Sequence, residues 1–151
     1  MTAQRFLAFD LGAESGRAVT ANLDGGRLTM REARRFANEP VRFSGALQWD
    51  ILRLWQEMRA ALDEQAGTRF TGIGLDAWGC DFALLGERGN LLENPYHYRD
   101  ARTDGVMQSV TARVSPERIY GLTGVQFLPF NTLYQLYAAC ERTPRLVEAA
   151  A

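Results

Sequence analysis

Apolar residues near the start of the chain occur in short runs that end at glycines or other turn-forming residues. Their spacing predicts three strands, at residues 5–11, 16–24 and 28–35. Asp24-Gly25-Gly26, between the second strand and the third, is a strong hairpin signal. Three consecutive strands joined by tight turns indicate an antiparallel meander and exclude a dinucleotide-binding βαβ unit at this end.

The period of the apolar residues changes to that of a helix after Asp50, a candidate N-cap. The positions that share one helix face are Ile51, Leu54, Trp55, Met58 and Leu62. Gly67 ends this run, and we expect another strand at 69–75 and a hairpin within 82–92. Later helices are predicted at 106–114, from Ser115-Pro116, from Asn131 and from Thr143-Pro144.

The last of these helices has only about two turns before Ala151, which leaves most of an apolar face missing. We therefore expect residues 1–151 to be an N-terminal domain that is itself cut short, with a second domain absent. The alternative is a natural C-terminus that frays in its alanines.

Composition narrows the classes of function. The chain has 46% hydrophobic and 23% charged residues, as a globular domain does, and its formal net charge of -1 does not favour nucleic acid or an acidic membrane. All 17 basic residues are arginine, which excludes a P-loop lysine and a Schiff base. Two lone cysteines and a single histidine argue against zinc. With no apolar segment of membrane length, the cytoplasm is the expected location.

FDLGAESGR, residues 9–17, places an acid, two glycines, a serine and an arginine directly after a strand. Gly12 and Gly16 would permit positive φ and let main-chain N–H groups converge on phosphate oxygens. Ser15 adds a hydroxyl donor, Arg17 can neutralise charge, and Asp10 could hold magnesium through water. The simpler interpretation is a glycine-rich β-turn with a surface arginine.

LDAWGCDFALL, residues 75–85, has the mixture that a sugar site needs. Asp76 and Asp81 can accept hydrogen bonds from hydroxyl groups, Trp78 offers an aromatic face, and Gly79 allows close approach of the backbone. A tryptophan in this setting is more often a core residue than a ligand platform. NPYHYRDART, residues 94–103, is rich in donors and acceptors, but a lone histidine such as His97 is more often structural than catalytic.

Together these motifs resemble known proteins. FDLGAESGR is similar to the first phosphate motif of the sugar kinase, actin and Hsp70 superfamily, although many relatives have threonine at Ala13. DAWGCDFALL, NPYHYRDART and GVQFLPFNTLYQL resemble the FGGY carbohydrate kinases, in particular those that phosphorylate L-rhamnulose. This resemblance covers essentially the whole chain.

The resemblance implies an α/β fold of the ribonuclease H-like, actin-like ATPase class, with a mixed five-stranded sheet and flanking helices. It implies ATP and Mg²⁺ as cofactors and L-rhamnulose as the small-molecule partner. By position it assigns Ala13, Glu14, Ser15, Gly16 and Arg17 to the ATP phosphates. Asp10 would face the metal and the transferred phosphoryl group, and Gly79, Trp78 and Asp81 would surround the sugar.

The family resemblance also implies what this chain lacks. The catalytic base is an aspartate well beyond residue 151, and the adenosine pocket belongs to the second domain, so we expect no turnover from these residues alone. Two alternatives stay open: a kinase for another ketose or polyol, and a non-catalytic sugar-sensing domain on the same fold.

Overall fold

The computed structural model describes residues 3–151, so Met1 and Thr2 of the expected domain lie outside the described residues. The chain divides into two compact units. The first consists of the residues up to Glu39 together with Asp50–Gly79, and the second of Pro40–Trp49 together with Cys80–Ala151.

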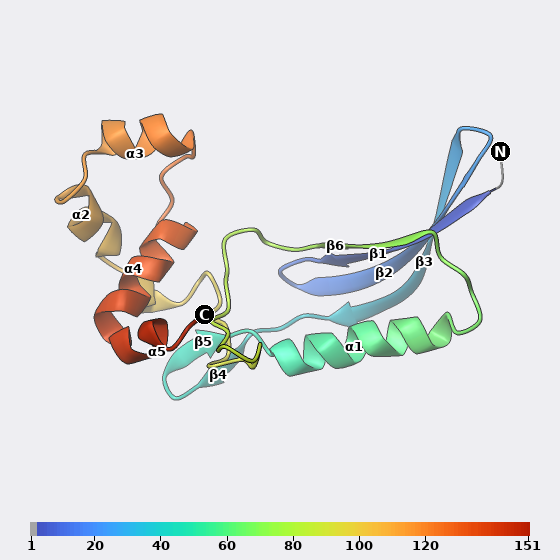
Figure 1. The fold of residues 1–151 in the computed structure, drawn as a ribbon, viewed down its shortest axis with the longest axis horizontal. Coiled ribbons are helices and arrows are strands. Elements are labelled where there is room, and N and C mark those ends of the chain that lie inside the picture. Colours follow the sequence, from blue (N-terminus) through green and yellow to red (C-terminus); the bar gives the residue numbers. More distant parts are fainter. Residues whose placement is uncertain (1–2) are drawn as a thin grey trace. The chain divides into compact units, whose positions relative to one another are not determined.

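The first unit is built on a four-stranded sheet in the order β3-β2-β1-β6 (Figure 1). Its strands are β1 (Gln4–Leu11), β2 (Ser15–Asp24), β3 (Arg27–Ala37) and β6 (Gly72–Asp76). The first three strands pair antiparallel, and β6 pairs parallel with β1. The predicted meander is therefore confirmed, and so are its hairpin glycines, because Gly25 and Gly26 both have positive φ.

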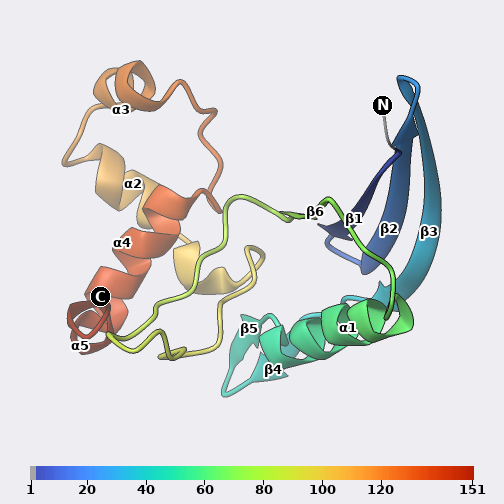
Figure 2. The same ribbon diagram turned by 45° about the vertical axis from the view of Figure 1, so that its right-hand side comes forward.

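Helix α1 (Ile51–Glu64) runs along one face of this sheet (Figures 1 and 2). Alternation along β1 turns Leu7, Phe9 and Leu11 toward the helix, where all three are buried. Burying each such side chain stabilises the fold by roughly 1.5–3 kcal/mol. The carboxylate of Asp50 caps the helix by accepting from the Arg53 N–H at 3.1 Å, as the sequence predicted.

Two features of the strands differ from expectation. The resemblance implied five strands in the main sheet, whereas the described residues form four and a separate two-stranded hairpin. That hairpin, β4 (Val41–Phe43) and β5 (Ala46–Gln48), was not predicted, because three-residue strands carry too few alternations to be detected. Its turn places Ser44 at φ 50°, a conformation that sequence patterns rarely assign to serine.

The second unit contains the hairpin β4–β5 and short helices. These are η1 (Ala101–Thr103), α2 (Val106–Thr111), α3 (Pro116–Thr123), α4 (Thr132–Arg142) and α5 (Pro144–Glu148). Val110, Ile119 and Tyr134 form the buried core where α2, α3 and α4 pack. The predicted helix starts are confirmed, although Asn131 uses its side-chain amide on the Gln126 carbonyl at 2.7 Å instead of capping α4.

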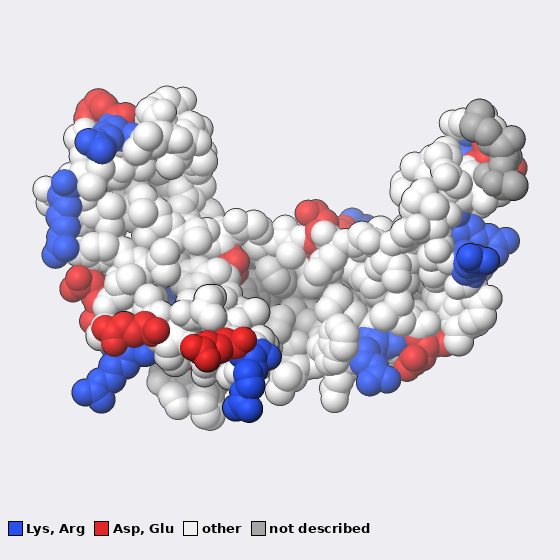
Figure 3. All heavy atoms as spheres, in the orientation of Figure 1, with Lys and Arg blue, Asp and Glu red and all other residues white. Residues whose placement is uncertain are grey.

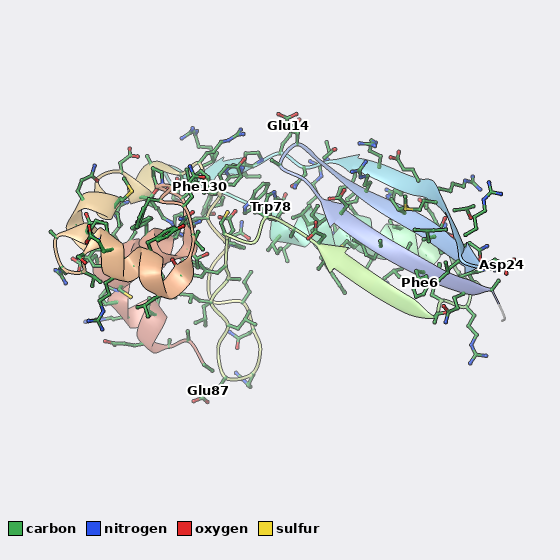
Figure 4. All side chains as sticks on the ribbon, turned by 90° about the horizontal axis from the view of Figure 1, so that it is seen from above. Phe6, Glu14, Asp24, Trp78, Glu87 and Phe130 are labelled. Atoms are coloured by element: carbon green, nitrogen blue, oxygen red, sulfur yellow. The ribbon has the colours of Figure 1, made fainter. Side chains whose placement is uncertain are left out.

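The predicted hairpin within 82–92 is reduced to a turn closed by one bridge between Leu85 and Leu91. Figure 4 shows Glu87 at the tip of this turn. On the visible face of both units acidic and basic side chains lie close to one another (Figure 3). Among residues 3–151, no helix has both the length and the apolar character needed to cross a membrane.

Candidate functional site

The turn between β1 and β2 is held in place mainly by hydrogen bonds to its carbonyl groups, and some of its main-chain N–H groups form no hydrogen bond within residues 3–151. The Gly12 carbonyl accepts from the Asn38 side-chain amide at 2.7 Å, and the Glu14 carbonyl accepts from the Asn38 N–H at 3.0 Å. The Gly12 N–H donates to the Ser15 carbonyl at 3.0 Å. The N–H groups of Ala13 and Glu14 donate to no other described residue. Two amides at the tip are thus available to an anion.

The environment of the turn keeps these amides accessible. Gly12, Ala13 and Ser15 are half-buried and Glu14 is exposed, whereas Asn38 beneath them is 3% exposed. Figure 4 shows Glu14 at the tip of the hairpin, with its side chain directed away from the sheet. Asn38 fixes the Gly12 carbonyl through its side-chain amide and the Glu14 carbonyl through its main-chain N–H, which leaves the N–H groups of Ala13 and Glu14 available, as an anion-binding turn requires.

The reason given for the two glycines was wrong. Neither Gly12 nor Gly16 has positive φ. A Cβ at position 16 would lie 2.2 Å from Cε2 of Phe36, and one at position 12 would lie 3.0 Å from the Ser15 carbonyl oxygen. Gly16 is therefore required because the Phe36 ring packs directly on the backbone of β2, and Gly12 because the turn is tight.

Four charged residues form a row across the sheet beside this turn, one on each strand. Register pairs Asp76 with Asp10, Asp10 with Arg17, and Arg17 with Arg35. Nε and Nη2 of Arg17 both donate to Oδ2 of Asp10, at 2.8 and 2.6 Å. The row has two acids at one end and two arginines at the other. Like charges on adjacent strands destabilise a sheet, so this order needs a reason other than stability.

Further contacts connect the arginine end of the row to the turn. Arg35 donates to Oγ of Ser15 at 3.3 Å and is also bonded to Glu32. The bond to Glu32 raises the pKa of Arg35, and the same bond lowers the pKa of the Glu32 carboxyl. Arg35 therefore stays charged next to the hydroxyl group that was predicted to contact phosphate.

The acidic end of the row fits a magnesium ion held mainly through water. Asp10 uses Oδ2 for Arg17, and its side chain remains 42% exposed. Asp76 is exposed and follows the parallel strand β6, so both carboxylates lie at the carboxyl ends of adjacent strands. Magnesium prefers one or two carboxylates with several retained waters. Within residues 3–151 no three His, Cys, Asp or Glu side chains are grouped to hold an ion by protein ligands alone.

Two of the predicted sugar contacts, Trp78 and Gly79, follow β6 in the first unit. The Trp78 ring is half-buried and packs against the core cluster of Leu11, Phe36 and Leu54. Gly79 has φ +69°, and a Cβ added there would meet open space. Glycine is therefore favoured at this position by its backbone conformation and not by lack of room. Trp78 therefore contributes to the core, which is the more common role of a tryptophan in such a setting.

The third predicted sugar contact, Asp81, lies in the second unit and is held by internal hydrogen bonds. Its Oδ2 accepts from Nε1 of Trp49 at 2.6 Å, and its Oδ1 accepts from Nε2 of Gln135 at 2.7 Å. The amide oxygen of Gln135 in turn accepts from Nη2 of Arg102 at 2.7 Å. Oδ1 also accepts a weak hydrogen bond from the Cys80 thiol at 3.8 Å, whereas Oδ2 has a second lone pair, so Asp81 keeps the capacity to accept a sugar hydroxyl.

His97 is buried, with 2% of its surface exposed, and serves the structure of its loop. Its Nδ1 accepts from the Arg99 N–H at 3.0 Å, and its ring centroid lies 4.1 Å from that of Trp49. Burial lowers the pKa of His97 and keeps the imidazole neutral near pH 7. Burial, and next the charge of Asp81, raises the pKa of the Cys80 thiol to about 11, which makes this thiol a poor nucleophile.

Three residues of these sites were not identified as site residues from the sequence: Asn38, Arg35 and Gln135. Arg35 was already placed in a predicted strand, and correct pairing of β2 with β3 would have brought it next to Arg17. Asn38 and Gln135 act through bonds to segments distant in sequence, for which a single sequence carries no signal.

Comparisons with known proteins show the family to which this chain belongs. Residues 5–151 match the N-terminal domain of the FGGY family of carbohydrate kinases. The chain is 44% identical over 148 residues to a rhamnulokinase of Pectobacterium atrosepticum and 41% identical over 148 residues to one of Oceanobacillus iheyensis. These alignments cover 95% of this chain, which spans only 30% and 31% of the two relatives.

Solved structures show the same fold. The gluconate kinase of Lactobacillus acidophilus superposes with a TM-score of 0.80 at 16% identity, covering 99% of this chain and 30% of that one. A xylulose kinase of the same organism gives 0.76 at 16% identity, covering 97% and 30%. The α/β, actin-like ATPase lobe expected from the sequence is thereby confirmed. The chain belongs to the FGGY family of carbohydrate kinases.

Proposed function

We propose that the longer protein to which this chain corresponds transfers the γ-phosphoryl group of ATP to the 1-hydroxyl of L-rhamnulose. The products are L-rhamnulose 1-phosphate and ADP, and the hydroxyl proton passes to a base. The choice of sugar is supported by the rhamnulokinases at 41–45% identity. The proposed chemistry rests on one observation. Two acids and two arginines lie in a row beside a turn that has two unbonded main-chain N–H groups.

The arginine end of the row and the turn would hold the phosphates. The amides of Ala13 and Glu14, the hydroxyl of Ser15, the backbone at Gly16 and the guanidinium of Arg17 form this set, and Arg35 extends it. A phosphate next to Arg17 and Arg35 would offset the repulsion between these two neighbouring cations. Positioning of the phosphoryl group and stabilisation of its charge are the main contributions a protein makes to this reaction.

The acidic end would hold Mg²⁺, with Asp10 and the adjacent Asp76 bonded to its water ligands. When bound, the ion would offset the charge that develops on the phosphoryl group. Arg17 has a second task here, because its two bonds to Oδ2 fix the orientation of the Asp10 carboxylate. The remaining oxygen of Asp10 is then the one presented to a water molecule.

The sugar would lie against Gly79, with Trp78 and Asp81 supplying an aromatic face and a hydrogen-bond acceptor. The catalytic base and the adenosine pocket would be supplied by chain beyond residue 151, in a second domain. This placement is supported by the chain spanning only about 30% of its relatives. We therefore expect residues 1–151 alone to give no turnover, and the free thiols of Cys80 and Cys140 to suit a reducing cytoplasm.

The proposal is tested with the substitution Arg17→Ala in the longer protein. We expect kcat to fall by about a hundredfold or more, because a charged contact to the transferred group is lost. Arg27→Ala, at the far end of the same sheet, is the matched control and should retain activity. If the protein binds the sugar but phosphorylates nothing, and Arg17→Ala leaves sugar affinity unchanged, a sugar-sensing domain is the better description.

The substrate is tested separately by competition. L-rhamnulose, xylulose, fuculose and glycerol should be compared by kcat/KM with saturating ATP. We expect L-rhamnulose to give the highest value. A higher value for another ketose or a polyol would retain the kinase mechanism and change only the sugar.

A further inference from the structure

The second unit contains a cavity of about 310 Å³ bordered by the turn of the β4–β5 hairpin, by η1 and by the end of α4. Small residues, among them Gly45, Ala138 and Ala139, leave the space open. This volume is at the small end of the range for ligand pockets. None of the residues assigned above to ATP, magnesium or the sugar lines it.

Arg102 is the unusual member of the lining, because it is a buried cation without a directly bonded anion. Its exposed fraction is 6%. No carboxylate of a described residue lies within 4.0 Å of its guanidinium, whose Nη2 donates to the neutral amide of Gln135. Its Nε is buried and bonds to no described residue. Buried charges are normally paired directly, whereas Asp100, Glu93 and Asp81 attract Arg102 only at longer range, so the guanidinium can still accept a directly bonded anion.

The ring of Tyr96 holds the guanidinium in place from one side, with its centroid 3.9 Å from Cζ of Arg102. Tyr96 also lines the cavity, and its hydroxyl bonds to no described residue. Burial raises the pKa of this hydroxyl, which therefore stays protonated and able to donate. The stacked pair thus presents a fixed cation and a hydroxyl donor to the same space.

The remaining charges of the lining leave an excess of positive charge. Arg142 lines the cavity from the end of α4, is exposed, and forms no ion pair with a described residue. The single lining acid, Asp100, has both oxygens occupied by backbone amides, those of Arg102 at 2.9 Å and Leu47 at 2.6 Å. Asp100 keeps its charge and, like Glu93 and Asp81, attracts Arg102 electrostatically, but the lining still holds two arginines against one carboxylate, which favours an anionic ligand.

We propose that this cavity binds a small molecule through an oxyanion group, a phosphate or a carboxylate, held between Arg102 and Arg142. The buried Arg102 supplies a fixed, desolvated contact to the anion. The exposed Arg142 supplies a second contact from the surface. Hydrogen bonds between arginine and such groups are about twice as strong as neutral ones, which suits recognition of a small anion in a partly open cavity.

The test is calorimetric titration of the protein with inorganic phosphate and, separately, with malonate at constant ionic strength. Arg142→Gln should weaken binding of the preferred anion by about tenfold or more. Arg145→Gln removes an exposed arginine three residues away that does not line the cavity, and it should leave affinity unchanged. Whichever anion binds more tightly identifies the group, phosphate or carboxylate.

The phosphate turn of the first unit is a competing site for inorganic phosphate, so Arg17→Gln is titrated as well. Anion binding that persists in Arg17→Gln and is lost in Arg142→Gln supports the proposal. Binding that is lost in Arg17→Gln and unaffected by Arg142→Gln overturns it and leaves the proposed kinase function intact. Absence of saturable binding of both anions also overturns it.

Discussion

The charged row of the first unit and the polar network of the second, formed by Asp81, Gln135 and Arg102, arrange charged side chains in opposite ways. In the row, Asp10 and Asp76 are neighbours, as are Arg17 and Arg35, and all four lie at an accessible edge. In the network, the charges of Asp81 and Arg102 are separated by the neutral amide of Gln135. The row places like charges together, whereas the network joins opposite charges through a shared partner.

From this difference we infer that the row serves binding and that the network serves the structure of the second unit. Buried polar groups must be bonded internally, and nearly every member of the network is. An exposed row with like charges adjacent gains nothing for folding, because surface ion pairs contribute little. We infer that substitutions in the row will change activity at constant stability and that substitutions in the network will change stability first.

The largest expected effect tests the row. Asp10→Asn in the longer protein should reduce kcat by about a hundredfold or more, since a charge beside the proposed metal is lost. Asp76→Asn should raise the magnesium concentration needed for half-maximal rate. Thermal melting of both variants should stay near that of the parent.

Asp24→Asn is the matched control for these two, because Asp24 lies at the opposite end of β2 (Figure 4). It should change neither rate nor magnesium dependence. If Asp10→Asn unfolds the protein instead of lowering kcat, the row has a structural role, and the contrast between the row and the network is wrong.

The second prediction concerns a substitution that disrupts the polar network. Gln135→Met removes the bonds to Asp81 and Arg102 and leaves the buried Arg102 and the half-buried Asp81 without their shared partner, which should cost about 3 kcal/mol in the free energy of unfolding. Equilibrium denaturation with urea measures this. Gln108→Met, on the exposed side of α2, should cost little. A loss below about 1 kcal/mol for Gln135→Met would show that the network is not a unit of stability.

The third prediction concerns pH. The pKa of His97 is lowered from 6.5 in the folded protein, so below pH 6.5 the unfolded chain binds more protons at this residue. Stability from His97 is therefore complete above pH 6.5 and is lost as pH falls toward the folded pKa, by at most about 1.4 kcal/mol per pH unit.

Urea denaturation between pH 7.5 and pH 5 in the parent and in His97→Gln measures this slope. The variant should be less sensitive to pH. Glu93, whose pKa burial raises, acts in the opposite sense and is present in both proteins, so it cancels in the difference. Equal slopes in the two proteins would contradict the assignment of a buried neutral imidazole.

The smallest expected effect comes from Tyr134, whose hydroxyl is buried and has no partner among the described residues. Tyr134→Phe removes an unsatisfied polar group and keeps the ring, which should raise the free energy of unfolding by about 1 kcal/mol. A loss of similar size would show that the hydroxyl is bonded in solution.

The sequence alone predicted the local elements well. Alternation over 5–35 and helical spacing over 51–62 predicted three strands and α1, because their apolar faces are long enough to set a period. A tight turn at residues 12–15 was also predicted from its glycine and serine, and the assignment of this turn to phosphate stays a prediction. What failed was the reason for Gly16, since an open turn and a backbone in contact with a ring both favour glycine, and only packing distinguishes them.

Pairing between distant segments was the part that could not be predicted. Asp76 was assigned to the sugar cluster because it precedes Trp78, and only the parallel register of β6 with β1 shows that it lies beside Asp10. Asp81 was identified as a sugar contact from its type, whereas its partners Trp49 and Gln135 are distant in sequence. A single sequence reveals the hydrophobic period of each helix and strand, but it does not reveal which distant side chains become neighbours in the fold.

The contact between Gly16 and Phe36 makes the identities of these two positions depend on each other. Any methyl group added at position 16 occupies the volume of the aromatic ring, so a larger residue there requires a smaller one at position 36. Gly16→Ala alone should be poorly tolerated, and Gly16→Ala combined with Phe36→Leu should recover part of the loss. Among related kinases the two positions should therefore vary together, and engineers who alter the turn between β1 and β2 will have to choose both residues at once.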